Sequence, residues 1–219
     1  MKHAASSNIE SVLAKTDPAL ARAIEAVIAR QGPVKLAPSH TPPFEALVRA
    51  VVYQSLSGNV AAAILTKLKQ AIGNTITPVN ILATSPASIL DAGLSNAKAR
   101  TIHNLATWFV SNEKLATALP QMADEDIFHA LSGIAGIGAW TVNVLLIFNF
   151  GRPDVLPVAD IGIRRGVQLI YGLIEIASTR MVQEKAELWR PYRSIASMYV
   201  WQAMKLKLGP TDLEEGRNQ

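Results

Sequence analysis

A glycine-rich turn and two carboxylates are the groups in this sequence best placed to do chemistry. The turn occupies residues 133–138 (GIAGIG), and an apolar, helix-like segment follows it. A proline-framed loop comes next; it contains Asp154 and ends at Asp160, and these are the only acidic residues between Ile127 and Ile174. A fixed carboxylate can stabilise a developing positive charge or activate a water molecule.

The glycine turn could bind an anion. Gly136 and Gly138 allow positive φ angles and close approach by another molecule. The N–H groups at the start of the following helix carry partial positive charge, and phosphate is their common ligand. The same glycines would also suit an ordinary corner between two helices. From the glycines alone, that corner is the favoured interpretation, because short glycine motifs have many false positives.

Asp160 stands where the next helix, about 161–171, is expected to begin. Aspartate is a favoured N-cap because its side chain accepts a backbone N–H. A purely structural cap is one interpretation of this residue, and by local chemistry the favoured one. The helix dipole would in either case keep the carboxylate charged. Asp154, which precedes Pro157, is expected to cap or brace the loop.

The hydrophobic pattern predicts an all-α protein, because apolar residues recur at helical spacing and no strand alternation, repeat or low-complexity block is present. A buried central helix is expected at about 139–150, and Asp17 is expected to cap the first helix of the chain. The other expected helices are 19–30, 44–54, 57–72, 78–83, 86–91, 95–110, 114–119, 124–131, 178–189 and 190–208.

Composition narrows the possible functions. The chain of 219 residues has no cysteine, which excludes disulfides, thiolate metal sites and iron–sulfur clusters. Its net charge of +4 suits a polyanionic partner, although many proteins that never bind nucleic acid carry such a charge. No secretory signal and no membrane-spanning run is recognisable, so an intracellular, soluble protein of the cytoplasm, nucleoid or nucleus is expected.

Four blocks of the sequence occur in an order that is typical of one protein family. The blocks are PFEALVRA with QSLS (43–50 and 54–57), GLSNAKAR (93–100), the turn and loop described above (131–160), and WRPYRSIA through Trp201 (189–201). Together they resemble the helix–hairpin–helix superfamily of DNA base-excision glycosylases. Within it, the chain is most similar to the 3-methyladenine DNA glycosylase II (alkylation-repair) branch.

The resemblance implies a helix–hairpin–helix DNA glycosylase fold with two helical lobes and the active-site cleft between them. One lobe is expected to comprise residues 1–55 and 172–219. The other is expected to comprise residues 56–171, with the helix–hairpin–helix at 131–150 and the catalytic loop at 151–160.

The resemblance also implies the reaction, which is hydrolysis of the N-glycosidic bond of an alkylated purine to leave an abasic site. Asp160 matches the catalytic aspartate of the family, and no cofactor is required. Trp140 occupies the position at which bifunctional relatives carry a nucleophilic lysine. Because an indole cannot form a Schiff base, a monofunctional enzyme without lyase activity is expected.

The remaining candidate residues fall into a base pocket, which the resemblance implies, and a DNA interface, for which any exposed arginine would be a candidate. Trp140, Trp201 and Tyr53 are candidates for the pocket, where the tryptophans could stack on a cationic base, although all three could instead be core residues. The candidate DNA-binding residues are Gly136, Gly138, Gln54, Ser55, Leu56, Arg164, Arg165 and Arg193.

Leu56 is the candidate side chain that fills the gap left by a flipped base, although a leucine packed inward is an equal alternative. A monovalent cation, Na⁺ or K⁺, is possible at the hairpin turn near Gly136 and Gly138.

The expected partner is double-stranded DNA with damaged bases, bound by a monomer. Two alternatives stay open. One is a glycosylase of the same fold for mismatched, deaminated or oxidised bases. The other is a non-catalytic helix–hairpin–helix DNA-binding protein, against which the presence of Asp160 argues.

Overall fold

The computed structural model describes residues 3–208, and these residues are helical with no β-strand. The all-α prediction is therefore confirmed. The chain divides into two compact units. The terminal unit contains Met1–Ala37 and Gly151–Gln219, and the middle unit contains Pro38–Phe150. Within the described residues, no helix combines the length and the apolar character that crossing a membrane would require.

The unit boundaries differ from the domain boundaries predicted from the sequence. Residues 38–55 were expected with the chain ends but belong to the middle unit, and residues 151–171 belong to the terminal unit. Shared cores explain the difference. The apolar face of α3 (Pro43–Tyr53) packs on α7 (Asn96–Ser111), where the rings of Phe44 and Phe109 meet edge to face at 5.2 Å.

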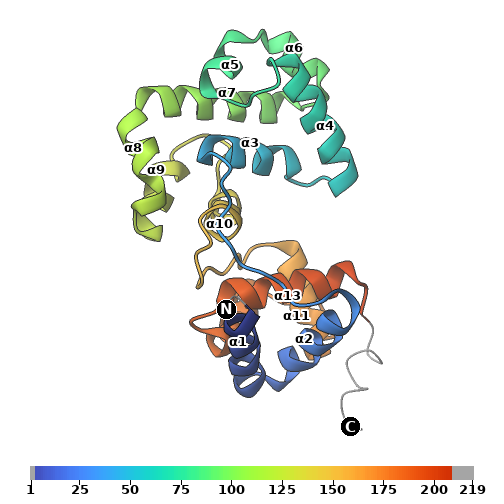
Figure 1. Cartoon of the computed structure of the whole chain (residues 1–219). Coiled ribbons are helices and arrows are strands. Elements are labelled where there is room, and N and C mark those ends of the chain that lie inside the picture. The colour runs from blue at the N-terminus through green and yellow to red at the C-terminus, as the bar shows by residue number, and fades with distance from the viewer. Residues whose placement is uncertain (1–2, 209–219) are drawn as a thin grey trace. The chain divides into compact units, whose positions relative to one another are not determined.

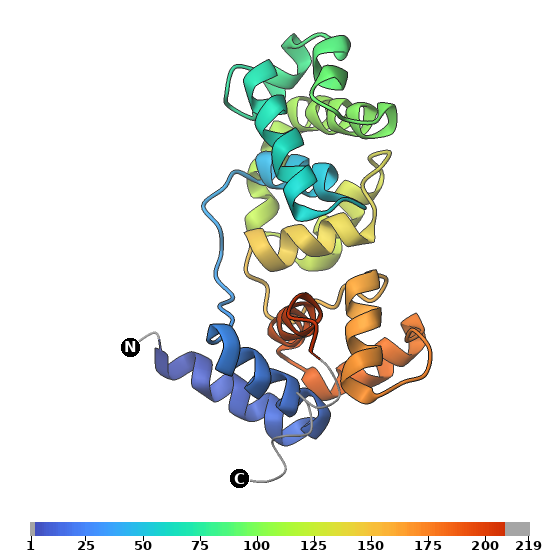
Figure 2. The ribbon, with the colours of Figure 1, turned by 90° about the vertical axis from the view of Figure 1, so that its right-hand side faces the viewer.

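The terminal unit is built around its last helix, which packs against α2 and α11 and lies between them in Figure 2. Its core includes the fully buried side chains of Trp189 and Tyr199. The helices of this unit are α1 (His3–Thr16), α2 (Pro18–Gln31), α11 (Ile161–Tyr171), α12 (Thr179–Ala186), the 3₁₀ turn η3 (Glu187–Trp189) and α13 (Arg193–Lys205) (Figure 1).

Asp17 joins several of these helices. Its carboxylate caps α2 by accepting the N–H groups of Ala19 and Leu20, which confirms the predicted cap, and it also accepts from Tyr171 Oη and Trp189 Nε1. Burial, with the hydrogen bond to Asp17, raises the pKa of Tyr171 and keeps the phenol a donor.

The first helix does not begin at Asp17 as predicted, because α1 precedes it. Leu13 of α1 is fully buried in the core of the terminal unit. The segment has only three large apolar residues, Ile9, Val12 and Leu13, which is too few for a clear helical period.

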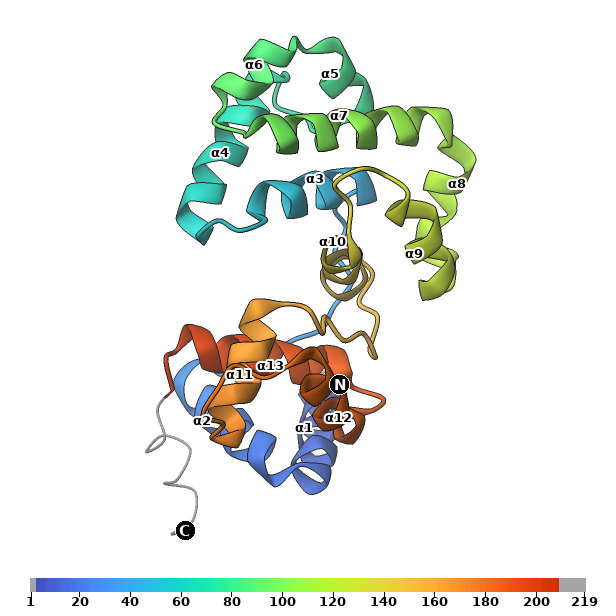
Figure 3. The same ribbon diagram turned by 180° about the vertical axis from the view of Figure 1, so that it is seen from behind.

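The middle unit is organised by α7, which lies between α3 on one side and α5 and α6 on the other (Figure 3). Its remaining helices are α4 (Gly58–Ala71), α5 (Pro78–Ala83), α6 (Pro86–Asp91), α8 (Glu113–Ala118), the 3₁₀ turn η1 (Leu119–Gln121), α9 (Asp124–Ser132), α10 (Ala139–Val144) and the π-helical turn η2 (Leu145–Asn149).

The expected single helix at 139–150 is therefore an α-helix followed by a π turn. The amide of Phe150 donates to the carbonyl of Leu145, which closes the wider turn. Asn149 in this turn is buried and its side chain donates to the carbonyl of Thr41 at 2.8 Å. A buried central helix was expected here, and Phe148 departs from that expectation because it is 45% exposed.

Candidate active site and DNA interface

Asp160 lies at the N-cap of α11, as the sequence predicts. Its Oδ1 accepts the N–H of Ile163 at 2.8 Å and the indole Nε1–H of Trp201 at 2.9 Å. Asp160 and Trp201 are both half-buried. At least one backbone donor and one side-chain donor therefore hold the carboxylate, in a residue that is not fully buried.

The contact with Trp201 changes the interpretation of that residue. The resemblance implies stacking on the base, whereas the structure shows a direct hydrogen bond from its indole to the candidate catalytic carboxylate. A role in the base pocket stays a prediction. The geometry adds a second role, which is to hold Asp160 in one orientation.

Gly162 makes room for this pair, a role that was not predicted from the sequence. A Cβ atom at Gly162 would lie 2.9 Å from Asp160 Oδ1 and 3.1 Å from Trp201 Cδ1, closer than ordinary carbon contacts allow. A glycine two residues after a capping aspartate is the signal that could have revealed the close approach.

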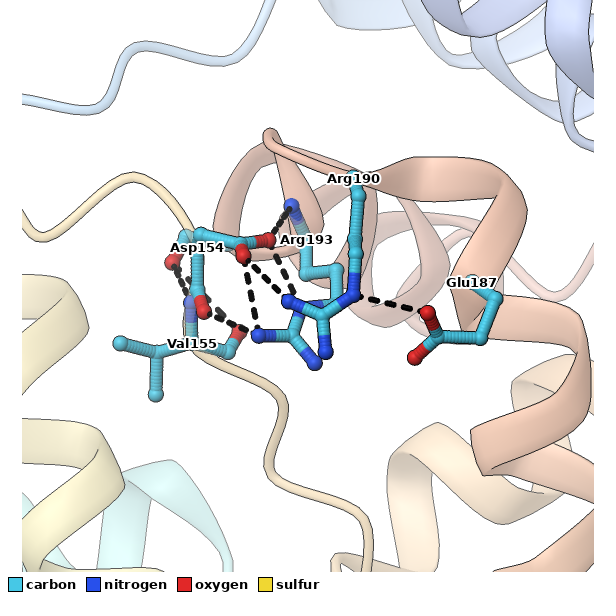
Figure 4. A network of polar contacts seen from close by, with 6 residues as sticks. Asp154, Val155, Glu187, Arg190 and Arg193 are labelled. Atoms are coloured by element: carbon cyan, nitrogen blue, oxygen red, sulfur yellow. Dashed lines mark hydrogen bonds and ion pairs between the residues drawn. The ribbon is translucent and has the colours of Figure 1, made fainter.

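The loop that carries Asp160 is braced by a network centred on Asp154 (Figure 4). Arg193 donates from Nε to Asp154 Oδ1 at 2.7 Å and from Nη2 to Oδ2 at 2.9 Å and to the backbone carbonyl at 2.8 Å. Arg190 pairs with Asp154 Oδ2 at 2.9 Å and with Glu187 at 2.8 Å. The expectation that Asp154 braces the loop is confirmed.

Electrostatics favour the charged form of Asp154. Burial alone would raise the pKa of its carboxyl group, but the hydrogen bonds and charge of Arg193, together with the charge of Arg190, outweigh burial and hold the pKa below its ordinary value. Ser194 extends the brace, because its hydroxyl accepts the N–H of Val155 at 3.0 Å and its own N–H donates to Pro153.

The three arginines predicted to contact DNA lie in different environments of the terminal unit. Arg193 is engaged with Asp154, so in this structure it is a brace of the loop. Arg164 donates from Nε to the carbonyl of Ala177 at 2.7 Å. Arg165 is exposed and lines a surface groove of about 520 Å³ together with Lys207. Among the three, Arg165 is the exposed cation.

The hairpin turn between α9 and α10 belongs to the middle unit. Its two candidate DNA-binding glycines differ in whether the fold requires a residue without a side chain. Gly136 has φ of +91°, and a Cβ there would lie 1.9 Å from Thr101 Oγ1 of α7, so both the backbone and the packing require glycine. Gly138 has an extended backbone and caps α10, and a Cβ there would meet nothing within 4 Å. The fold itself therefore does not require glycine at position 138.

The loop after α3 lies against this hairpin. Gln54 donates from Nε2 to Thr141 Oγ1 at 2.9 Å and to the carbonyl of Gly136 at 3.4 Å. Ser55 has φ of +55°, a strained value for a residue other than glycine. Leu56 is 37% exposed, so it is not a fully buried core side chain, and its place in a DNA interface stays a prediction.

Trp140 and Tyr53, the other two residues predicted for the base pocket, belong to the middle unit. Trp140 is half-buried in the first turn of α10, and Tyr53 is half-buried at the end of α3. Neither is a fully buried core residue. Their place in a pocket stays a prediction.

No cluster of three or more acidic or histidine side chains within residues 3–208 could hold a metal ion.

Comparisons with known proteins identify relatives of this chain. The model of the HhH-GPD superfamily of base excision DNA repair proteins matches residues 48–191. The chain is 30% identical to the alkylbase DNA glycosidase-like protein mag2 of Schizosaccharomyces pombe, over 82% of this chain and 87% of that protein. It is 32% identical to DNA-3-methyladenine glycosylase 1 of the same organism, over 75% and 73% of the two chains.

A solved structure is similar as well. The S. pombe 3-methyladenine DNA glycosylase Mag1, in complex with abasic DNA, superposes with a TM-score of 0.81 at 27% identity. The superposition covers 90% of this chain and 97% of that one.

Proposed function

Because this chain belongs to the HhH-GPD superfamily of base excision DNA repair proteins, we propose that it is a monofunctional DNA glycosylase for alkylated purines of the 3-methyladenine type. The relatives named as alkylbase or 3-methyladenine glycosylases support this substrate class. The observation that carries the proposal is Asp160, fixed at the start of α11 by Ile163 and Trp201.

Asp160 supplies what the reaction needs. As the bond between C1′ and the base nitrogen breaks, its electrons leave with the base and positive charge develops on the sugar. A carboxylate held beside the sugar stabilises that charge and accepts a proton from the water that adds to C1′. An N3- or N7-alkylated purine already carries a positive charge, so it leaves as a neutral base and needs no acid catalyst.

Trp140 supports hydrolysis without strand cleavage. A lyase reaction requires an amine that forms a Schiff base with the sugar, and an indole nitrogen cannot do this. At this position an aromatic ring can instead stack on an electron-poor, cationic base. We therefore expect free base and an intact abasic strand as products.

Two parts of the middle unit are proposed to contact double-stranded DNA. The N–H groups that start the helical segment after Gly138 would bind a backbone phosphate, since helix N-termini attract anions. Leu56, exposed on the loop after α3, would fill the space left by the extruded base. Arg165 is the proposed side-chain contact in the terminal unit.

A monovalent cation at the hairpin is a further part of the proposal. The turn offers backbone carbonyl oxygens, which are the hard ligands that Na⁺ and K⁺ prefer. The carbonyl of Ile134 accepts one hydrogen bond, from the N–H of Ile137, and retains a second lone pair, so it could ligate such an ion. The ion would lie between the carbonyl oxygens of the turn and a DNA phosphate and would offset the negative charge of the phosphate. Cleavage of the glycosidic bond itself requires no metal. We also propose that the protein acts as a monomer. We propose that it is intracellular because its substrate is DNA.

The test is a base-release profile. Duplexes carrying 3-methyladenine, 7-methylguanine, ethenoadenine, hypoxanthine or 8-oxoguanine are incubated with the protein, and the freed bases are quantified. We expect release of the methylated purines and no covalent complex after borohydride treatment. Release of only oxidised or deaminated bases would favour the other glycosylase function, and no release would favour a non-catalytic binding protein. A trapped complex would contradict the monofunctional assignment.

A further inference from the structure

Lys98 in the first turn of α7 contacts the loop that carries Leu56. Its ammonium group donates to the carbonyl of Val52 at 2.8 Å and to the carbonyl of Gln54 at 2.7 Å. The last carbonyls of a helix have no partner within the helix, and a cation placed there also interacts favourably with the helix dipole. Lys98 thus caps the C-terminal end of α3.

The loop needs such support. It leaves α3 through Ser55, whose left-handed backbone is costly for a side chain other than glycine, and residues 55–60 are exposed. Strained conformations persist only where surrounding contacts hold them. Two short, charge-assisted hydrogen bonds at Val52 and Gln54, directly before the strained residue, provide this restraint.

The same turn of α7 also contacts the hairpin. Thr101 lies three residues after Lys98 and therefore on the same face of the helix, and it packs against Gly136 so closely that no Cβ atom would fit. The side chain of Gln54 completes the arrangement by donating to Thr141 and to the carbonyl of Gly136. One helical turn therefore touches two segments that are about 80 residues apart in the chain.

We infer that Lys98 is a positioning residue, which fixes the Leu56 loop against the hairpin. The side chain that fills the space of the extruded base and the backbone that binds phosphate are then held at a fixed distance from each other. This inference rests on the proposed glycosylase function. Lys98 acts through the loop and touches neither the base nor the sugar. Burial lowers the pKa of its ammonium group, which agrees with a lysine that faces carbonyl oxygens more than water.

A direct phosphate contact is the competing role for a lysine in this place. The two roles differ in their dependence on salt. A lysine that neutralises a phosphate contributes about 0.9 to the slope of log affinity against log salt concentration. A lysine whose hydrogens are directed at protein carbonyls contributes nothing to that slope.

The experiment compares Lys98→Met, Lys98→Arg and a control, Lys114→Met, an exposed lysine on α8 beyond the far end of α7. Hydrogen exchange of a peptide covering residues 53–58 measures the protection of the loop's backbone amides in the absence of DNA. Fluorescence of 2-aminopurine beside the lesion measures base extrusion, single-turnover release measures the reaction, and a salt titration measures affinity for abasic DNA.

We expect Lys98→Met to accelerate exchange in the loop and to lower base extrusion and release by about tenfold, because two charged hydrogen bonds are lost. Lys98→Arg keeps donors for the carbonyls and should recover most of the loss. The salt slope should stay that of the wild type, and Lys114→Met should change nothing.

Unchanged loop exchange in Lys98→Met would overturn the inference, as would a salt slope reduced by about one unit. These outcomes differ from failure of the proposed function, which would appear as no base release by the wild type while the exchange comparison still reports on the loop.

Discussion

The terminal unit and the middle unit hold their functional groups by different means. In the terminal unit, polar side chains hold carboxylates, with Trp201 on Asp160 and two arginines on Asp154. In the middle unit, the backbone itself is held, by close packing of Gly136 against Thr101 and by the hydrogen bonds of Lys98 to the carbonyls of Val52 and Gln54 before Ser55. Side chains orient a reacting group, whereas an exposed backbone offers N–H groups to a polyanion. We therefore propose that the terminal unit supplies the chemistry and the middle unit most of the contacts with DNA.

The largest effect is expected from Asp160→Asn. Asparagine can still cap α11 but carries no charge, so the sugar cation loses its stabilisation and base release should fall by about 10²–10³-fold. Single-turnover release of 3-methyladenine measures this. Glu175→Gln, an exposed carboxylate in the same unit, is the matched control and should keep full activity. Release by Asp160→Asn at the control's rate would remove this residue from the mechanism.

The next largest effect is expected from Gly136→Ala. The added methyl group would meet Thr101 at 1.9 Å on a backbone with positive φ, so the free energy of unfolding should fall by about 2–4 kcal/mol. Urea denaturation measures it.

Gly133→Ala is the control, because a Cβ there meets nothing within 4 Å and the backbone is helical. The control should stay within about 0.5 kcal/mol of the wild type. Equal losses in both variants would show that the contact with Thr101 does not set the requirement for glycine.

A smaller effect is expected from Trp201→Phe. Phenylalanine keeps an aromatic face but cannot donate to Asp160, so base release should slow by about tenfold while affinity for abasic DNA is kept. Single-turnover kinetics and a binding titration separate the two quantities. A rate equal to that of the wild type would mean that only the aromatic face matters and that the hydrogen bond does not orient the carboxylate.

The smallest effect is expected from Asp154→Asn. The pKa of Asp154 is lowered in the folded protein, so its stabilising contribution is fully present above the ordinary value of 3.8 and is lost as the pH falls through the folded value. The variant should be less stable than the wild type by about 1 kcal/mol at neutral pH, since the pair is partly exposed.

Chemical denaturation between about pH 7 and pH 3 gives the comparison, in which the two stability curves should converge on the acid side. A constant gap across this range would show that the charge of Asp154 is not what the arginines stabilise.

Local patterns in the sequence predicted much of the fold and part of the site. Helical periodicity gave the all-α class, and N-cap chemistry placed Asp17 and Asp160 at the starts of α2 and α11. These features depend on residues within one turn of each other. The glycine turn was also recognisable from its residue types, whereas the loop of Leu56 was identified only through the resemblance of residues 54–57 to the family.

Contacts between distant segments could not be predicted in this way. The bond from Trp201 to Asp160 spans 41 residues, and that from Lys98 to Val52 spans 46. No periodicity records which distant residue faces a given side chain. The unit boundaries were misplaced for the same reason, since they depend on which helices share a core. The roles of Gly162 and Lys98 likewise depend on contacts with residues that are distant in the sequence.

The most direct test of this division of labour compares Asp160→Asn with Gly138→Ala. Both are expected to fold, because asparagine can cap a helix and a Cβ at Gly138 meets nothing within 4 Å. The single-turnover rate at saturating enzyme and the affinity for abasic DNA are measured for each. Asp160→Asn should lose the rate and keep the affinity, whereas Gly138→Ala should keep the rate and lose affinity by roughly tenfold, since its methyl group blocks the approach of a phosphate. If each variant lost both quantities together, or if the two losses were exchanged, the account would be contradicted.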